Sequence, residues 1–199
     1  KIMESVRKGR GLPDGAEQEM IDAGVPDWYI GSCKKIKYLF PKAHAVAYVM
    51  MAFRIAWFKV NHPLAFYAAY FYRRSQKGGF DANLMARGMD VVKASIEAIE
   101  QNEDSTAKDD DLLTTLEVAY EFYLRGFDFL PIDFYHSHAT KFLIKDGKLL
   151  PPFVSISGLG ENAAWDLMEG REGKQFISIE EISEACPKVS KTHIQMLKD

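Results

Sequence analysis

Apolar residues recur every three to four positions over much of the chain, which is the spacing of one face of an α-helix. This spacing predicts helices over residues 16–23, 42–60, 64–73, 89–101 and 112–124. The segment 42–60 is apolar on nearly every face, a pattern typical of a helix inside a core. We therefore expect a mainly helical fold in which residues 42–60 are buried.

Two short segments have the pattern of strands instead. Residues 127–132 and 141–150 look extended, and Asp146-Gly147 is a strong signal for a two-residue hairpin turn. The stretch 102–111 is polar and acidic, so we expect an exposed loop that contains the three aspartates 109–111. The fold should therefore be mainly α with a small β portion.

The composition is that of a globular protein. Of 199 residues, 47% are hydrophobic and 27% are charged, so the chain has enough apolar surface for a core and is not disordered. We find no internal repeat. We place a boundary in the acidic stretch, which gives predicted domains of residues 1–105 and 106–199.

Cysteine usage and hydropathy indicate the compartment. Cys33 and Cys186 lie far apart without the spacing of a metal site, which suits a reducing environment. The start of the chain lacks the pattern of a signal peptide. The apolar stretch 45–60 contains Arg54 and Lys59 and is a poor membrane span. We expect a cytoplasmic protein with no membrane partner.

The charge is unevenly distributed along the chain. The net charge is −3, yet residues 1–77 contain 13 lysines and arginines against 6 acidic residues. A basic first third suggests an anionic partner, either phosphate groups or nucleic acid. On charge alone, the simpler alternative of a solvated charged surface is favoured.

One glycine motif could bind a phosphate. Gly158-Leu159-Gly160 precedes a predicted helix, and glycines let consecutive backbone N–H groups point outward beside the positive end of that helix. Such a hairpin grips a DNA backbone without reading bases. The alternative is an ordinary turn between helices.

A second hairpin follows some 30 residues later. Ser190 is a suitable helix N-cap, and Lys188 and Lys191 flank it. Paired short helices with basic hairpins are how a helix-hairpin-helix unit binds a duplex. This second hairpin lacks the glycine pair of the first.

A second cluster could bind a triphosphate. Lysine ammonium groups and a histidine at a helix start hold phosphates by charge and hydrogen bonds, and Tyr48, one turn beyond His44, could stack on a sugar or base. The alternative for His44 is a partly buried structural histidine. The candidate residues are Arg7, Lys8, Arg10, Lys42, His44 and Tyr48.

The sequence offers no complete catalytic site. We find no carboxylates with the spacing of a catalytic metal site, no phosphate-binding P-loop and no nucleophilic triad. We therefore expect a protein that binds and positions its ligands, with no catalytic residue of its own.

Three blocks of sequence resemble one family. Residues 28–71, with the block FPKAHAVAY, are similar to the fingers region of bacterial C-family replicative DNA polymerases, and specifically of the PolC type of DNA polymerase III α subunit. Residues 3–12, MESVRKGRGL, resemble the entry to the same region. Residues 149–167, LLPPFVSISGLGENAAWDL, resemble the segment leading into the duplex-binding domain of these polymerases.

The resemblance implies a fold, an activity and partners. It implies a C-terminal fragment of a DNA-directed DNA polymerase, with a fingers region followed by a helix-hairpin-helix domain. The triphosphate cluster would bind the incoming deoxynucleoside triphosphate, and the two hairpins, Gly158, Leu159 and Gly160 with Lys188, Ser190 and Lys191, would bind duplex DNA.

The same resemblance implies what lies elsewhere in such an enzyme. The catalytic carboxylates and their Mg²⁺ ions belong to a palm domain expected before Lys1, and the sliding clamp binds a C-terminal peptide expected beyond Asp199. The palm and thumb are further expected partners. We expect this chain alone to be inactive and to hold no cofactor.

Two other classes of function remain open from the residues. One is a stand-alone helix-hairpin-helix DNA-binding module, which the second half alone could support. The other is a protein-interaction domain in which the aromatic helices over residues 43–73 form a groove for a partner.

Overall fold

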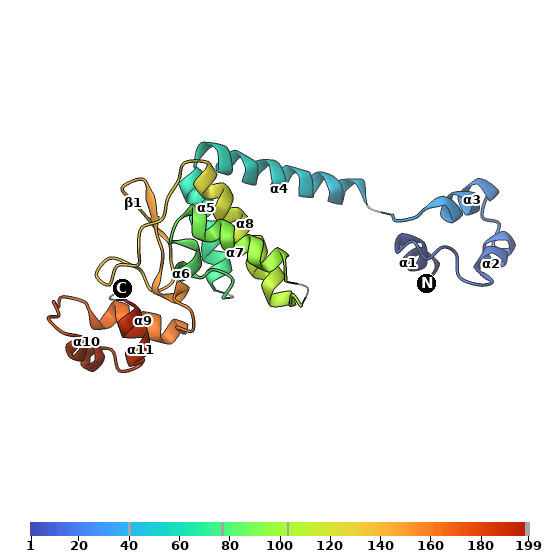
Figure 1. The fold of residues 1–199 in the computed structure, drawn as a ribbon. Helices are drawn as coiled ribbons and strands as arrows, with labels where there is room; N and C mark the ends of the chain where they lie inside the picture. Colours follow the sequence, from blue (N-terminus) through green and yellow to red (C-terminus); the bar gives the residue numbers. More distant parts are fainter. Residues whose placement is uncertain (40, 77, 103, 198–199) are drawn as a thin grey trace. The chain divides into compact units, whose positions relative to one another are not determined.

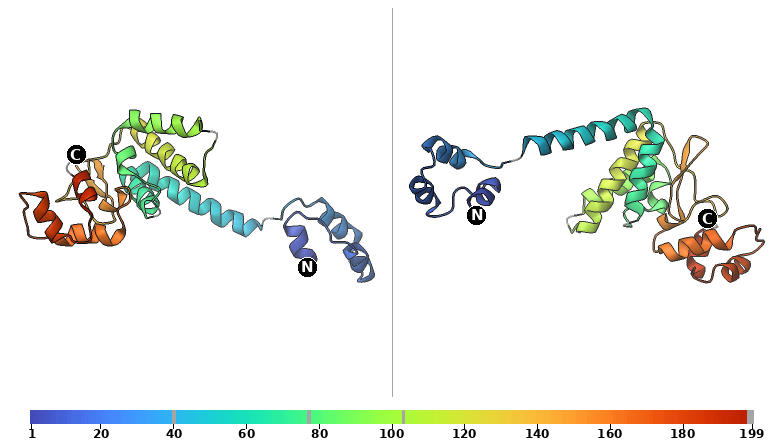
Figure 2. Two further views of the ribbon diagram at one scale, coloured as in Figure 1. Left: turned by 60° about the horizontal axis from the view of Figure 1, so that its bottom comes forward. Right: turned by 180° about the vertical axis from the view of Figure 1, so that it is seen from behind.

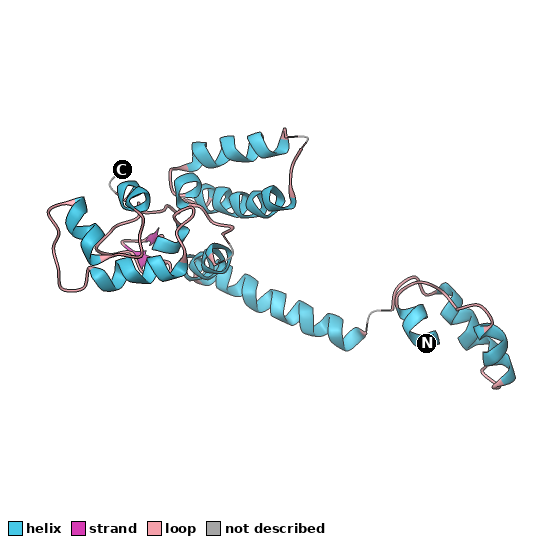
Figure 3. Ribbon diagram, turned by 90° about the horizontal axis from the view of Figure 1, so that it is seen from below, coloured by secondary structure: helices cyan, strands magenta, loops and turns pink. Residues whose placement is uncertain are grey.

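The computed structural model describes residues 1–39, 41–76, 78–102 and 104–197. Phe40, in the block FPKAHAVAY, lies outside the described residues. The chain divides into two compact units, Lys1–Ala56 and Trp57–Asp199. Both are built mainly of helices, as the colouring of Figure 3 shows.

The first unit holds three short helices around a small core. They are α1 (Ile2–Arg7), α2 (Ala16–Asp22) and α3 (Asp27–Lys35). The segment after α3 returns to the end of α1, where the Leu39 amide donates a 3.2 Å hydrogen bond to the carbonyl oxygen of Arg7. The buried core residues are Val6, Met20, Ile30 and Cys33.

The long apolar helix is not buried, so this part of the prediction was wrong. Helix α4 (Lys42–Asn61) contains no buried residue, and Phe53 at its middle is 73% exposed. A helix that is apolar all round needs contacts on every face, and the described residues do not supply them. Its exposed large apolar side chains are Val46, Tyr48, Val49, Met50, Met51, Phe53, Ile55, Trp57, Phe58 and Val60.

Helix α4 is also long and apolar enough to cross a membrane, by length and composition only, with a mean hydropathy of 1.2. One such helix is weak evidence, because core helices of soluble proteins pass the same test. Its C-terminal end is joined by polar contacts to α8 (Ala107–Leu124) and to the residue after α8. The Lys59 ammonium lies 2.7 Å from the Glu121 carboxylate, and the Arg125 guanidinium donates to the Lys59 carbonyl oxygen.

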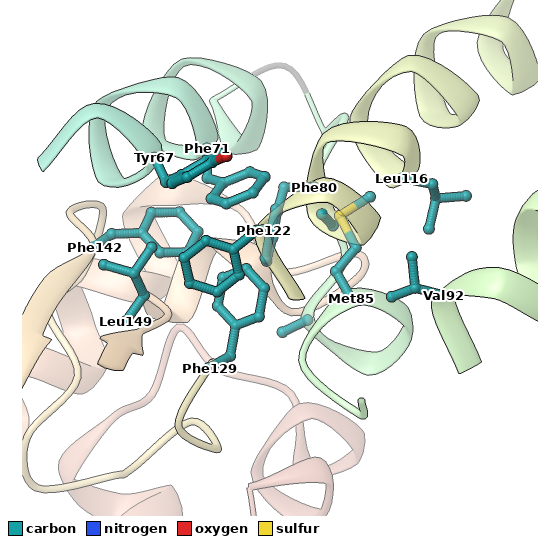
Figure 4. Packing of buried hydrophobic residues seen from close by; sticks show 12 residues of the cluster. Tyr67, Phe71, Phe80, Met85, Val92, Leu116, Phe122, Phe129, Phe142 and Leu149 are labelled. Atoms are coloured by element: carbon teal, nitrogen blue, oxygen red, sulfur yellow. The ribbon is translucent and has the colours of Figure 1, made fainter. Parts of the chain in front are cut away.

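The second unit is organised by α5 (Pro63–Ser75), α6 (Ala82–Met85), α7 (Met89–Glu100) and α8 (Ala107–Leu124). Helices α7 and α8 lie side by side (Figures 1 and 2). Phe71 of α5 stands at the centre of the core, with ring centroids 5.1–5.9 Å from those of four other phenylalanines (Figure 4). These four are Phe80, Phe122, Phe129 and Phe142.

Helix α8 begins five residues earlier than predicted. Thr106 caps it, because its hydroxyl accepts a hydrogen bond from the Asp109 amide while the Asp109 carboxylate accepts one from the Thr106 amide. The three aspartates 109–111 therefore lie in the first turn and a half of a helix, not in a loop. Carboxylates are favourable there because a helix N-terminus is positive.

The predicted strands are present in shortened form. Strands β1 (Leu143–Lys145) and β2 (Lys148–Leu150) pair antiparallel, with Leu143 opposite Leu150. Asp146 and Gly147 both have positive φ, +52° and +75°, as a type I′ turn requires. Of the predicted strand 127–132, only Phe129 forms a bridge, to Leu149.

The C-terminal part has a core of its own. A short 3₁₀ turn, η1 (Phe153–Ser155), precedes α9 (Glu161–Gly170), α10 (Ile179–Ala185) and α11 (Lys191–Met196). Buried apolar residues of η1, α9 and α11, among them Phe153 and Leu167, pack together, and partly buried apolar residues of α10 pack against them. The expected fold class, mainly α with a small β portion, is confirmed. The boundary between residues 105 and 106 stays a prediction.

The hydroxyl of Tyr123 joins α8 to the loop between α6 and α7. It donates a 2.8 Å hydrogen bond to the Met85 carbonyl oxygen and accepts one of 3.2 Å from the Gly88 amide. Burial raises the pKa of Tyr123 to about 12, against an ordinary value of 10.0. The unfolded chain therefore ionises first as the pH rises, so stability falls between about pH 10 and pH 12.

Replacing Tyr123 by Phe should lower the free energy of unfolding by about 1 kcal/mol at pH 7, because two hydrogen bonds are lost. It should also weaken the fall in stability above pH 10. Urea denaturation at pH 7 and along an alkaline series measures both effects. Tyr120→Phe is the matched control on the same helix, since its hydroxyl has no hydrogen bond within the described residues. Equal effects of the two variants would contradict the assignment.

Candidate nucleic-acid interface

The first predicted hairpin presents several unpaired backbone amides. Gly158 has a positive φ of +79°, and Gly160 is the N-cap of α9. The amide of Leu159 donates to the Ile156 carbonyl oxygen at 3.1 Å, which closes the turn. Within the described part of the chain no acceptor binds the amides of Gly158, Gly160, Glu161 and Asn162. Free amides at the start of a ten-residue helix form a concavity suited to an anion.

The second hairpin has the same backbone design, displaced by 30 residues. Its Val189 amide donates to the Cys186 carbonyl oxygen at 3.1 Å, as Leu159 does to Ile156. Ser190, the N-cap of α11, has φ −70° and ψ 150°, close to the −72° and 158° of Gly160. Leu159 and Val189 are both buried. The two hairpins therefore repeat one motif, although their backbones differ at one position: φ is positive at Gly158 and not at the equivalent Lys188.

This repeat corrects the conclusion that the chain has none. The repeated features are the bond that closes the turn, the N-cap conformation and the order of buried and exposed positions, while the φ angle at positions 158 and 188 and most side chains differ. Gly158 corresponds to Lys188, and Gly160 to Ser190. A comparison of side chains alone misses it for that reason.

The lysines of the second hairpin are partly neutralised. The Asp166 carboxylate on α9 accepts a 2.8 Å hydrogen bond from the Lys188 amide and lies 4.0 Å from the Lys188 ammonium. Lys191 has an electrostatic interaction with the Glu180 carboxylate. The pKa of the Glu180 carboxyl is lowered chiefly by a hydrogen bond from the backbone amide of Glu180 itself. The Ser178 hydroxyl and the charge of Lys191 lower it further.

His193 lies between the two hairpins. Its Nδ1 is 2.8 Å from the Ser190 hydroxyl, and its Nε2 would be 3.3 Å from a Cβ atom placed on Gly158. A side chain at position 158 would therefore press on the imidazole. The close approach and the positive φ both explain why glycine stands there.

Arg171 attaches this domain to the preceding loop. Its guanidinium donates hydrogen bonds to the carbonyl oxygens of Phe134 and Ser137 and stands over the Phe153 ring, 5.1 Å from its centroid. The hairpins are thus held on a fixed support.

The predicted triphosphate cluster lies on two segments, one on each side of Phe40. Lys42, His44 and Tyr48 share the first turns of α4 and are not sealed in a core. The rings of His44 and Tyr48 meet edge to face, with centroids 4.5 Å apart. This confirms that Tyr48 stands one turn beyond His44.

The other three cations of the cluster lie at and after the end of α1. The Glu4 carboxylate is 2.8 Å from the Arg7 guanidinium and 3.0 Å from the Lys8 ammonium. The hydrogen bond from Arg7, followed by that from Lys8, lowers the pKa of Glu4 to about 2. Arg10 is exposed. A bound triphosphate would compete with Glu4 for Arg7 and Lys8.

Known proteins match both halves of the chain. The helix-hairpin-helix motif family matches residues 126–199. The chain is 50% identical over 198 residues to the PolC-type DNA polymerase III of Bacillus cereus and 50% over 198 residues to that of Bacillus subtilis. It is 51% identical over 199 residues to the PolC-type enzyme of Caldanaerobacter subterraneus. The expected resemblance to PolC-type polymerases is confirmed.

The match covers nearly all of this chain but little of each relative. The alignments include 99% to 100% of the chain and 14% of each PolC-type polymerase. The chain therefore corresponds to one segment of these polymerases. Among its described residues no group of three or more His, Cys, Asp or Glu side chains could hold a metal ion.

Three residues of this PolC-like segment escaped the sequence analysis. Glu4 could have been found, because spacings of three and four residues place it beside Arg7 and Lys8 on a helix. Asp166 contacts a residue 22 positions away, and His193 approaches a residue 35 positions away. No local pattern signals those two contacts.

The glycines of the first hairpin should differ in their tolerance of substitution. Gly158→Ala places a Cβ in the left-handed region and against His193, so we expect a loss of about 1–2 kcal/mol in the free energy of unfolding. Gly160→Ser copies Ser190 at the equivalent N-cap and should gain a few tenths of a kcal/mol. Urea denaturation of both variants tests this. A stable Gly158→Ala chain would show that position 158 does not need glycine.

Proposed function

We propose that this chain is the part of a PolC-type DNA polymerase that holds the incoming deoxynucleoside triphosphate and the product duplex in the bacterial cytoplasm. The first hairpin supports this most directly, because four amides without acceptors in the described chain lie in a segment matching the helix-hairpin-helix family. Contacts of this kind bind phosphates and carry no sequence information. Such binding suits an enzyme that must copy any template.

Duplex contacts are assigned to both hairpins. At the first, the backbone of Gly158, Leu159 and Gly160 would hold one phosphate. At the second, the Ser190 hydroxyl and the ammonium groups of Lys188 and Lys191 would contact the backbone nearby. The two hairpins are structural repeats packed on one core, which supports joint binding to one duplex.

The triphosphate is assigned to the start of α4 and the end of α1. Lys42 and His44 would neutralise the phosphate tail and Tyr48 would contact the sugar or base, with Arg7, Lys8 and Arg10 as further cations. In the polymerase reaction a 3′-hydroxyl attacks the α-phosphorus and pyrophosphate leaves. Cations along the tail stabilise the charge that moves to this leaving group. The carboxylates that hold the Mg²⁺ ions belong to the palm, elsewhere in the polymerase.

The exposure of α4 supports a further part of the proposal. Exposing large apolar side chains on every face of a helix to water is unfavourable, so another surface is expected to cover them. The relatives are long enough to supply that surface, because 99% of this chain aligns to only 14% of one of them. We assign the faces of α4 to packing against the palm and thumb of the same polymerase. The sliding clamp is assigned to a C-terminal peptide outside this chain.

Duplex binding by this chain should be weak and sensitive to salt, because its net charge is −3. Lys191→Ala should weaken binding by about threefold at low salt and lower the slope of log K against log salt by about 1. Fluorescence anisotropy with a labelled duplex of arbitrary sequence measures both. Lys93→Ala, on α7 and far along the chain from either hairpin, is the control. No binding by the unaltered chain, or equal effects of the two variants, would refute the duplex role.

The triphosphate role can be tested by affinity labelling. A deoxynucleoside triphosphate with a lysine-reactive group on its γ-phosphate should label Lys42, and excess unmodified triphosphate should protect it. Lys35, exposed on α3, is the internal control and should not be protected. Mass spectrometry of the digested chain locates the label. Labelling at neither residue, together with a tight protein partner, would instead favour a protein-interaction domain.

A further inference from the structure

The two hairpins repeat one backbone design but have different neighbours. The amide at position 158 is unpaired within the described chain, and the imidazole of His193 lies close to where a side chain of residue 158 would begin. The equivalent amide, at position 188, is bound by the Asp166 carboxylate. The first hairpin therefore lies next to His193, and the second lies next to Asp166.

We infer that Asp166 is an internal competitor for the DNA phosphate at the second hairpin and so limits the affinity of the domain for duplex. The inference rests on the proposed duplex-binding function and concerns a residue to which that function gives no role. Asp166 lies on α9, which follows the first hairpin, and contacts the second hairpin. In the same way His193 lies on α11, which follows the second hairpin, and approaches the first.

The geometry of Asp166 resembles that of a bound anion. One carboxylate oxygen accepts the Lys188 amide at 2.8 Å, and the other lies 4.0 Å from the Lys188 ammonium. An amide and a lysine are the groups that bind a phosphate in such hairpins. The Asp166 side chain is only 14% exposed, while that of Lys188 is 66% exposed. The carboxylate is thus fixed in place, and the lysine is the part that can turn to a phosphate.

The contrast with the first hairpin strengthens the assignment. There, the facing helix presents His193, which has no negative charge in either protonation state and can donate a hydrogen bond to an anion. Within the described residues no carboxylate accepts a hydrogen bond from the amides of the first hairpin, although Asp81 and Glu161 line the same cavity. A phosphate entering the second must draw Lys188 away from Asp166 and approach a like charge.

The test is the substitution Asp166→Asn in the full chain. The Asn oxygen still accepts the Lys188 amide, so the hairpin keeps its shape, but the charge is gone. We expect duplex to bind about threefold to tenfold more tightly at low salt, with a salt slope steeper by about 0.9, the value for one phosphate contact. Glu169→Gln, the same charge change one turn along the same helix, should shift affinity by less than twofold.

A second substitution keeps the inference testable even if Asp166→Asn fails to fold. Lys188→Ala alone should lower the salt slope by well under ~0.9, because Asp166 opposes the contact between the Lys188 ammonium and a phosphate. In the Asp166→Asn background the same substitution should remove the added 0.9. A drop of the full ~0.9 for Lys188→Ala alone, or equal gains for Asp166→Asn and Glu169→Gln, would overturn the role of Asp166. Failure of the unaltered chain to bind duplex would instead overturn the proposed function.

Discussion

The position of the hairpins depends on the phenylalanine cluster around Phe71. Its rings come from α5, α8, the segment before α6 and the segment between α8 and β1, so one contact set fixes elements that are distant in sequence. From this cluster the chain continues through residues 130–142 to the hairpin core. The Phe153 and Val154 amides donate to the carbonyl oxygens of His138 and Ala139 there, and Arg171 binds the same loop. Weaker packing in the aromatic cluster would make the segment that holds both hairpins more mobile.

The amide groups of the first hairpin need no basic side chain to attract an anion. Glu161 follows it directly in sequence, and at the second hairpin Lys188 lies 4.0 Å from the Asp166 carboxylate. Under the proposed function, oriented backbone dipoles would contribute more to binding than net charge. Contact through dipoles acts over a short range, so a duplex held in this way would move along the surface without first escaping a strong electrostatic field.

Local sequence signals predicted the fold well. Apolar periodicity predicted α5 and α7 within two residues, and Asp146-Gly147 predicted the turn between the strands. The start of α8 was missed, although Thr106 and Asp109 have the spacing of a capping box. The burial of α4 was wrong for a deeper reason. Periodicity reports which faces are apolar, but not whether other residues exist to cover them.

The candidate site was predictable only in its backbone motifs. Glycine and N-cap residues indicated Gly158, Gly160 and Ser190, because their roles depend on local geometry. The contacts of Asp166 and His193 arise from the packing of one helix-hairpin pair on the other, which no local pattern encodes. The repeat of the two hairpins was hidden for the same reason, since it lies in torsion angles and hydrogen bonds.

The division of the chain at Ala56 has a practical meaning for anyone preparing this protein. The residues from Trp57 onward contain the phenylalanine cluster and the hairpin core, and they keep the ion pair between Lys59 and Glu121. Most of the apolar side chains that α4 leaves facing water come before that point. A shorter polypeptide beginning near Trp57 would retain both buried clusters and lack most of the exposed apolar surface of α4. Because that surface favours aggregation, the shorter polypeptide is better suited to crystallisation and spectroscopy.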